Sequence, residues 1–540
     1  MSAGTVWTRG QKIAFRIAFI FFICLSVPNS VEWYDTVIHI DWTRLNYRDL
    51  YDIARFGSGI NVFGNSLFGS TLLGYANWVI TLLIAIAGGL LWTMIVRRRE
   101  RQEYNTLYYW LRVVVRYRAG IGIIGFGFTK LLPVQMPYPG LGLLNTNFGD
   151  MTAQKIFWLS VGIVPWYQIF AGVVEVLAGT LLFFRRTTTI GAILLLGALG
   201  DIVYVNFAYD GGVHVYSSYF VLLAAFLLVD DVPRLYRLLI QERPVTPVTV
   251  YPVFAARWLR VTRVGLKTLT IFLFLGVLFY LQLINFLYDP YKQPAVAGVK
   301  TLRGLYHVTE FRRNNKVVPY SPLDSLVWQE VEFEKWSSLS FVANRPVPLD
   351  LSNGGGDPQR DVNRSFEITG VAGGRRVFHY YADTVDRVLY LEDKYKATPD
   401  RRNRAAGVGG DGPAALPEEG RGRRRKKPAA DYQAGVEQTP KGGKGGAWIP
   451  PAALAHIGKE VEQIDPRAAS TRRDRDYAQG GDPGSAKEKR NRMILHYDTI
   501  DGSRVVLSGV DEKKDSIYIV LDRVNKNYAL TESSLQAGKY

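Results

Sequence analysis

The sequence predicts a bundle of membrane-spanning helices followed by a small β-rich domain. Two observations support this prediction. Up to about residue 290, long apolar runs rich in aromatic and aliphatic residues alternate with short basic loops. After about residue 295 the chain is more polar, and short segments alternate apolar and polar residues as half-buried strands do. The composition averaged over all 540 residues conceals the difference between the two halves.

Seven apolar segments are predicted to cross a membrane, because a helix needs about 20 mainly apolar residues to span the hydrocarbon. They cover 12–29, 75–96, 112–132, 159–184, 188–208, 213–230 and 266–287. The first segment contains Arg16, and CLSVPNS after it lacks a small-x-small cleavage site, so we expect a retained anchor. Residues 1–290 are therefore expected to form a transmembrane helical domain.

Lysine and arginine gather in alternate loops, and this bias predicts the orientation of the bundle. The N-terminus, residues 97–101, residues 185–186 and residues 234–267 are basic, so we expect them in the cytoplasm. The intervening loops are poorer in basic residues. The pattern predicts a bacterial cytoplasmic (inner) membrane protein with a cytoplasmic N-terminus and an extracytoplasmic C-terminal domain.

The C-terminal domain is predicted to contain five to eight antiparallel strands in a small barrel or sandwich. The segments WQEVEFEKW, RRVFHYYA, RVLYLED, MILHYDT, SRVVLSG and SIYIVLDR have strand patterns. An Asp-Gly pair predicts a hairpin between MILHYDT and SRVVLSG. The domain is expected over 295–395 plus 493–530. Residues 396–492 are expected to be a disordered basic insert with one short helix in PAALAHIGKEVEQI.

The net charge of +17 does not indicate a nucleic-acid partner, because the basic residues lie in short loops between apolar segments and in the insert. The run RGRRRKKP is interpreted as a solvated linker, with binding to anionic lipid head groups or envelope polymers as the alternative. The single cysteine, Cys24, excludes a disulfide or a thiolate metal site within one chain.

Three stretches in the third to sixth segments carry a family resemblance: KLLPVQMPYPG, WYQIFAGVVEVLAGTLLFFRRTTTIGA and GDIVYVNFAYDGGVHVYSSYF. They resemble the DoxX family of bacterial membrane proteins over about residues 110–232, in particular a subgroup with extra helices and a C-terminal β-domain. That family includes a subunit of a thiosulfate:quinone oxidoreductase. The subgroup often has a lysine where this chain has His214, so a cationic ligand contact expected there is in doubt.

Ionisable and polar side chains inside the apolar segments are the candidate site residues, because burying them in a bilayer costs free energy. Helical rise places Lys130, Glu175 and Asp201 at similar depths near mid-membrane, with Asn206 nearby. We expect Lys130 to contact at least one of the two carboxylates. One interpretation is a ligand site with Lys130 and Asn206 as donors and Glu175 as proton acceptor. The other is a buried ion pair that only fixes helix packing.

Tyr209, Asp210 and His214 are further candidates at the outer end of the bundle. One histidine there cannot supply the two facing ligands of a haem. His379 and His496 are expected on facing strands and are interpreted as barrel residues, so no metal site is predicted.

The glycines of AGIGIIGFG match a dinucleotide-binding pattern at Gly120, Gly122 and Gly125. That pattern requires a strand followed by a helix start, whereas these glycines lie inside an apolar segment. We therefore expect them to allow close helix packing.

The resemblance implies an accessory redox subunit that binds a quinone or a similar hydrophobic small molecule. The sequence has no haem ligand pair, flavin motif or thiol pair, so we expect any redox chemistry to belong to a partner protein. Two alternatives stay open. One is a non-enzymatic envelope anchor that presents the β-domain to a partner, and the other is a transporter or a membrane-embedded modifying enzyme.

Overall fold

The computed structural model describes most, but not all, residues of the 540-residue chain. They are 7–56, 60, 72–98, 101–245, 252, 256–347, 349–355, 359–395, 448–468 and 490–532. The chain divides into two compact units. Of the described residues, those within 7–136 and 164–286 belong to the helical unit, and those within 137–163 and 287–532 belong to the barrel unit.

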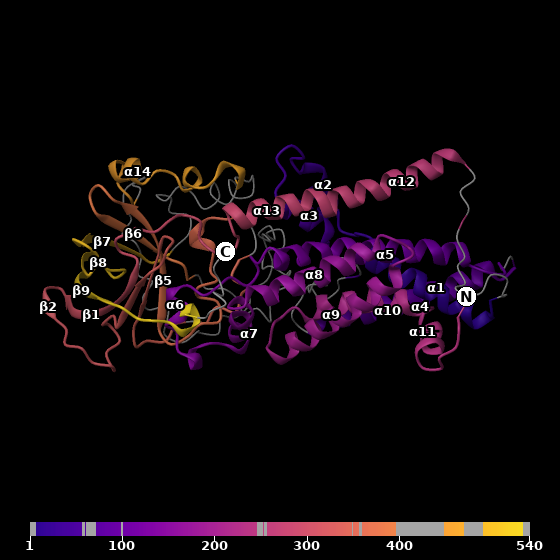
Figure 1. Cartoon of the computed structure of the whole chain (residues 1–540), viewed down its shortest axis with the longest axis horizontal. Helices are drawn as coiled ribbons and strands as arrows, with labels where there is room; N and C mark the ends of the chain where they lie inside the picture. Colours follow the sequence, from indigo (N-terminus) through magenta and orange to yellow (C-terminus); the bar gives the residue numbers. More distant parts are fainter. Residues whose placement is uncertain are drawn as a thin grey trace, which may run out of the picture. The chain divides into compact units, whose positions relative to one another are not determined.

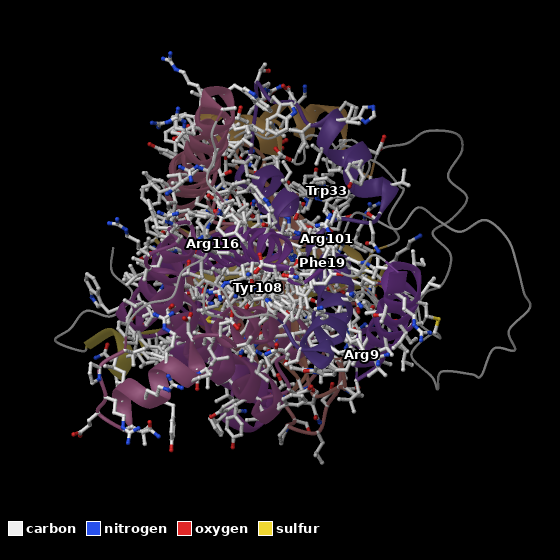
Figure 2. The ribbon with its side chains drawn as sticks, turned by 90° about the vertical axis from the view of Figure 1, so that its right-hand side faces the viewer. Arg9, Phe19, Trp33, Arg101, Tyr108 and Arg116 are labelled. Carbon is white, nitrogen blue, oxygen red and sulfur yellow. The ribbon has the colours of Figure 1, made fainter. Side chains whose placement is uncertain are left out.

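The helical unit contains helices over the predicted apolar segments and three further helices, α2, α3 and α11, outside them (Figure 1). They are α1 (Arg9–Ser26), α2 (Val31–His39), α3 (Tyr47–Ala54), α4 (Leu73–Ile95), α5 (Asn105–Leu131), α8 (Pro165–Leu182), α9 (Thr188–Ala208), α10 (His214–Leu228), α11 (Val232–Leu239), α12 (Arg257–Ile271), the π-helix η3 (Phe272–Val277) and α13 (Leu278–Tyr288). Figure 2 shows Phe19 and Tyr108 among the side chains near the centre of the view, and Arg9 towards its edge.

Four helical segments of the described chain are long and apolar enough to cross a membrane. They are 74–95, 165–182, 188–208 and 257–288. A fifth is added if α10 and α11, which are bent by 72° relative to one another, form one span. The predicted segments 12–29 and 112–132 form helices α1 and α5, which carry several lysines and arginines. The structure therefore supports a membrane protein with four to five candidate spans.

Helices α5 and α8 pack closely because glycines face the neighbouring backbone. A Cβ atom added to Gly120 would lie 3.0 Å from the carbonyl oxygen of Gly179. A Cβ added to Gly172 would lie 2.2 Å from the backbone nitrogen of Leu131. Gly122 and Gly125 likewise face aromatic rings. The expectation that the glycine pattern serves helix packing is confirmed.

The barrel unit contains a closed, antiparallel, eight-stranded barrel (Figure 1). Its strands are β1 (Gly304–Arg313), β3 (Glu330–Phe333), β4 (Ser338–Val342), β5 (Arg375–Asp383), β6 (Val388–Asp393), β7 (Arg492–Asp498), β8 (Arg504–Val510) and β9 (Ser516–Val524), and the short β2 (Lys316–Val317) pairs with β1. Each strand pairs with the next, and β1 pairs with β9 to close the barrel. Strands β1 and β4 were not among the predicted segments.

The barrel interior is filled by side chains that alternate along each strand. In β8 the inward residues Val505 and Leu507 are fully buried, and Phe333 and Leu389 face the same core. Strands β7 and β8 form the predicted hairpin, and Gly502 in its turn has a φ of 78°, which glycine adopts without strain. The hydrophobic core therefore lies inside the barrel.

Residues 137–163 fold with the barrel and correct the predicted domain boundary. They form α6 (Leu141–Leu144), the 3₁₀ helix η2 (Phe148–Asp150) and α7 (Ala153–Gly162). Met151 forms a β-bridge with Val371. The predicted span 159–184 is also interrupted, since α7 ends at Gly162 and α8 begins at Pro165, a residue suited to a helix start. The barrel unit is therefore assembled from distant parts of the chain.

Part of the predicted disordered insert is folded. Residues 448–468 form α14 (Pro451–Ile457), η7 (Glu460–Gln463) and η8 (Pro466–Ala468). Ile449 and Ala453 are buried against Tyr381 and Tyr390 of the barrel. The predicted short helix is confirmed, and disorder over all of 396–492 is wrong for this segment because it covers apolar surface. Residues 396–447 and 469–489 lie outside the described residues.

Candidate functional site

Lys130 and Glu175 form a buried ion pair in the helical unit. Lys130 lies in the last turn of α5, and Glu175 lies in the middle of α8. The Lys130 ammonium contacts Glu175 Oε1, and the two residues are only 9% and 1% exposed. A Cβ atom added to Gly127 would lie 2.9 Å from the backbone nitrogen of Val176, so the two helices are close at this level. The expected contact between Lys130 and a carboxylate is confirmed.

The second carboxylate oxygen of Glu175 takes no part in the ion pair with Lys130. Oε2 is buried, and it has no hydrogen-bond partner within the part of the chain that the structure describes. A buried carboxylate oxygen ordinarily accepts at least one hydrogen bond. On the same helix, Gln168 is fully engaged: it accepts from the Met136 N–H at 2.9 Å and donates to the Met136 carbonyl. Glu175 can therefore accept one further hydrogen bond.

Asp201 does not join this pair. Helix α9 buries the face that contains Leu195, Leu199 and Asn206, whereas Asp201 is exposed on the opposite side. The prediction compared depths along the helices, and depth does not fix the direction in which a side chain points. The grouping of Asp201 with Lys130 and Glu175 is therefore wrong.

Asn206 shapes the turn after α9. Its amide nitrogen donates to the Ile202 carbonyl at 2.7 Å, and its oxygen accepts from the Val213 N–H at 3.3 Å. The neighbouring candidates Tyr209 and Asp210 are exposed, and Asp210 has a positive φ of 50°. The structure thus places Asn206 in the last turn of α9, where its contacts fix the following turn, and its predicted role as a ligand donor beside Lys130 has no support in these contacts.

His214 lies in an aromatic cluster at the start of α10. Its ring stacks on Phe207 at a centroid distance of 4.4 Å and on Tyr75 at 5.6 Å. The Tyr75 hydroxyl is 3.2 Å from His214 Nδ1 and 2.9 Å from Ser218. These contacts tie α4, α9 and α10 together.

A group of buried arginines was missed by the sequence analysis. Arg118 of α5 donates to the carbonyl oxygens of Ala54 and Phe56, and its guanidinium lies 4.1 Å from the centre of the Phe56 ring. Arg55 lies 5.4 Å from the Tyr51 ring. The signal was present, because Arg118 is a charged residue inside the predicted segment 112–132.

Two buried lysines of the barrel unit lie against a pair of stacked aromatic rings. Trp158 and Phe366 stack at 6.1 Å. The Lys155 ammonium lies 3.7 Å from the Phe366 ring centre, and the Lys292 ammonium lies 4.0 Å from that of Trp158. They donate to the carbonyl oxygens of Phe366 and Asn353, respectively. Neither forms an ion pair with any described residue.

Burial makes both lysines weak bases. It lowers the pKa of Lys155 to about 7, although the negative charges of Glu367 and Asp350 oppose this effect. Burial together with the nearby charge of Lys155 holds the pKa of Lys292 well below the usual 10.5. Both lysines therefore lose their proton more readily than a solvent-exposed lysine does.

Buried carboxylates lie close to these lysines. Glu334 accepts a 2.9 Å hydrogen bond from the Gly142 N–H, and burial and the charge of Glu367 raise its pKa to about 7. Glu367 itself pairs with Lys394. Glu334, Glu367 and Lys292 are among the residues that line a small cavity. Since most partners of these groups are backbone atoms or each other, the contacts hold α6 and α7 to the barrel.

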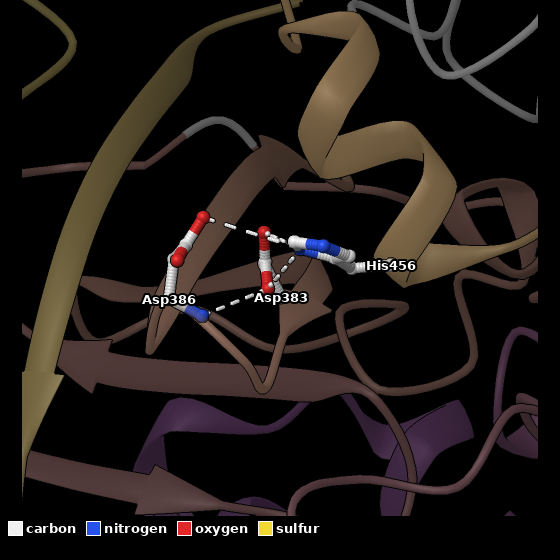
Figure 3. Close-up of side chains that lie close together, drawn as sticks. All are labelled: Asp383, Asp386 and His456. Carbon is white, nitrogen blue, oxygen red and sulfur yellow. Dashed lines mark hydrogen bonds and ion pairs between the residues drawn. The ribbon is translucent and has the colours of Figure 1, made fainter.

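His456, Asp383 and Asp386 bring together three potential metal ligands (Figure 3). His456 Nδ1 lies 3.0 Å from Asp383 Oδ2 and 4.0 Å from Asp386 Oδ2. Asp383 Oδ1 also accepts from the backbone N–H groups of Val385 and Asp386. These bonds are sufficient to explain why the three side chains lie together. The contact between His456 and Asp383 attaches α14 to the β5–β6 turn.

The expectation that His379 and His496 lie on facing strands is wrong. On β6, His379 is opposite Glu392 and His496 is opposite Val388, four residues away. His379 is also buried, and burial lowers its pKa to about 3.

Comparisons with known proteins place one match on this chain. The chain is 31% identical over 94 residues to the uncharacterized protein YwoB of Bacillus subtilis (strain 168). The match covers 16% of this chain and 61% of that protein, so it spans less than two thirds of the relative. No family model matches the chain. No solved structure matches it.

Proposed function

We propose that this chain is a DoxX-like protein of a bacterial inner membrane that binds a quinone or similar hydrophobic small molecule as an accessory redox subunit. In this proposal seven helices span the membrane, because α1 and α5 cross with the five candidate spans. The barrel unit lies outside the cytoplasm. The basic loops at alternate ends of the apolar segments support this orientation.

The observation that carries the proposal is the second oxygen of Glu175. It is buried in an apolar helical unit, and the described residues give it no donor. A hydroxyl group of a reduced quinone is a suitable donor, and the Lys130 ammonium contacts the other oxygen of the same carboxylate. An apolar ring and tail suit the surrounding helices. Glu175 then accepts a hydrogen bond from the quinol and one of its two protons, while the second proton leaves to water and both electrons pass to a partner protein.

Extraction of the gently purified protein tests the proposal. Organic extracts analysed by mass spectrometry are expected to contain a quinone in near-stoichiometric amount. Glu175→Gln should remove it while the protein stays folded. Asp201→Asn is the matched control, because it removes a carboxylate from a neighbouring helix that faces away from the pair. Equal quinone content in wild type and Glu175→Gln contradicts the assignment of the site.

Reporter fusions test the orientation separately. A reporter that is active only outside the cytoplasm should work after Tyr540 or within residues 405–445. The same reporter should be silent near Arg99 or Arg243. The opposite pattern overturns the topology, and activity at Arg99 alone means that the first segment does not span.

A second candidate function is a non-enzymatic envelope anchor. The filled interior of the barrel favours it, since a core of packed side chains leaves the outer surface of the barrel for recognition. On this proposal the purified protein carries no quinone but retains an envelope protein in fixed stoichiometry, and barrel-surface substitutions release that partner.

A further inference from the structure

Asp201 is a charged residue on the outward face of a helix suited to cross a membrane. Helix α9 has 21 residues and a mean hydropathy of 1.9. It packs through the face that contains Gly191, Leu195 and Leu199. Asp201 lies on the other side, is exposed, and has no hydrogen bond or ion pair with the described residues. The pairing of Lys130 with Glu175 leaves this carboxylate without the partner predicted for it.

The position of Asp201 along α9 makes its exposure costly in a bilayer. With a rise of 1.5 Å per residue, it lies about 20 Å from Thr188 and about 10 Å from Ala208. If α9 spans the membrane, the carboxylate is inside the hydrocarbon. Charged residues at such depths almost always face a protein interior or a partner charge. A second protein helix is the simplest way to provide one.

The surface around Asp201 allows a helix to approach closely. Gly197 lies one turn before Asp201 on the same side, and a Cβ atom added to it would meet nothing within 4 Å. The side chains of Ile190, Ile193 and Tyr204 are exposed along the same line. Glycine on a membrane helix lets a neighbouring backbone come near, which shortens the distance between polar partners. We call Ile190, Ile193, Gly197, Asp201 and Tyr204 the Asp201 face.

We propose that the Asp201 face binds a transmembrane helix of a partner protein that carries a lysine or arginine, and that this cation pairs with Asp201. A two-fold contact between copies of this chain is less suitable, because self-complementary packing through this face brings the two Asp201 carboxylates together. The proposal depends on α9 spanning the membrane and is independent of the ligand assigned to Glu175.

Synthetic transmembrane peptides test the proposal with the full-length protein. Three fluorescent peptides of Leu and Ala differ only at one central residue, which is Lys, Leu or Glu. Affinity-tagged protein in mixed lipid–detergent micelles is expected to retain about fivefold more Lys peptide than Leu peptide, the effect of a modest polar contact between membrane helices. Asp201→Asn should abolish the difference, and Gly197→Leu should reduce it by blocking close approach.

The control variant removes a different carboxylate of the same region. Asp210→Asn removes an exposed carboxylate beyond the end of α9, and asparagine tolerates the positive φ at that position, so the preference for Lys should persist. Equal retention of the three peptides overturns the proposal, as does an unchanged preference in Asp201→Asn. Self-association of the protein that Asp201→Asn abolishes also overturns it and assigns the face to a second copy.

Discussion

The two units bury lysine in different ways. In the helical unit, the Lys130 ammonium contacts a carboxylate, and the pair has no net charge. In the barrel unit, Lys155 and Lys292 lie against aromatic rings and donate to backbone carbonyl oxygens. An ion pair keeps both partners charged, whereas burial without a counter-charge favours the neutral amine. Substitution of Lys130 should therefore lower stability strongly, because it leaves a buried carboxylate without its counter-charge. Lys155 and Lys292 should instead make stability depend on pH.

The largest expected effect is at the helical pair. Lys130→Met leaves the Glu175 carboxylate buried without its counter-charge, so we expect the free energy of unfolding to fall by about 3–5 kcal/mol. Thermal unfolding in detergent, followed by circular dichroism, measures the change. The double variant Lys130→Met/Glu175→Leu should recover much of the loss. Asp201→Leu, at an exposed position, should change stability by less than about 0.5 kcal/mol. Additive losses in the double variant contradict the pairing.

The lysines of the barrel unit should produce a pH dependence instead. The pKa of Lys155 falls from 10.5 to about 7 on folding, so between these values the unfolded chain binds the proton and the folded one does not. Stability therefore rises with pH over this interval, by at most about 1.4 kcal/mol per pH unit from this group. The penalty for burying this lysine is fully present below about pH 7 and is gone above 10.5.

Urea unfolding between pH 7 and 9, followed by tryptophan fluorescence, checks this slope. Lys155→Met should reduce the slope, and Lys155→Met/Lys292→Met should reduce it further, because the pKa of Lys292 is also lowered. Glu334 does not confuse the result, because its raised pKa of about 7 acts at lower pH. A wild-type slope that persists unchanged in Lys155→Met shows that another group is responsible.

The folded part of the insert allows a smaller test of how the barrel unit is stabilised. Replacing 400–488 with a short Gly/Ser linker uncovers the surface that Ile449 covers, which should cost about 2 kcal/mol. A variant that keeps 448–468 and shortens only the flanks should retain the stability of the parent. Equal stability of the two variants shows that α14 contributes nothing to the barrel.

The smallest effect is expected at the ion pair between α14 and the barrel. His456→Ala removes one of the hydrogen bonds to Asp383, whose backbone donors remain, so the loss should be about 1 kcal/mol. Limited proteolysis within 448–468 should become faster. Asp386→Asn is the control, because its carboxylate is 64% exposed and 4.0 Å from the imidazole. Destabilisation of the wild type by EDTA indicates a bound cation and rejects the ion pair as sufficient.

The sequence predicted features that depend on local pattern. Apolar length located the helices, alternation located six of the strands, and the Asp-Gly pair located the β7–β8 hairpin. Depth along a helix correctly placed Lys130 level with Glu175. The same argument failed for Asp201 because nothing local fixes the rotation of α9 relative to its neighbours.

Features that depend on distant contacts were missed. Strand β1 is irregular, with a register shift between Val308 and Glu310, so its alternation is interrupted. The stacked rings of Trp158 and Phe366 bring together α7, Lys292 and a loop of the barrel unit, which are far apart in sequence. The insert was judged by its average composition, and this conceals the few apolar residues of 448–468 that pack on the barrel.

The division of the barrel unit between distant parts of the chain has a consequence for protein synthesis. Residues 137–163 leave the ribosome long before β9, which closes the barrel against β1. About 360 residues separate the two, and at 5–20 residues per second their translation takes roughly 20–70 seconds. During the first part of that time, until Phe366 and Val371 are made, α6 and α7 lack the residues against which they pack. Nascent chains therefore pass through a long interval in which buried residues such as Leu143 are accessible to chaperones and proteases.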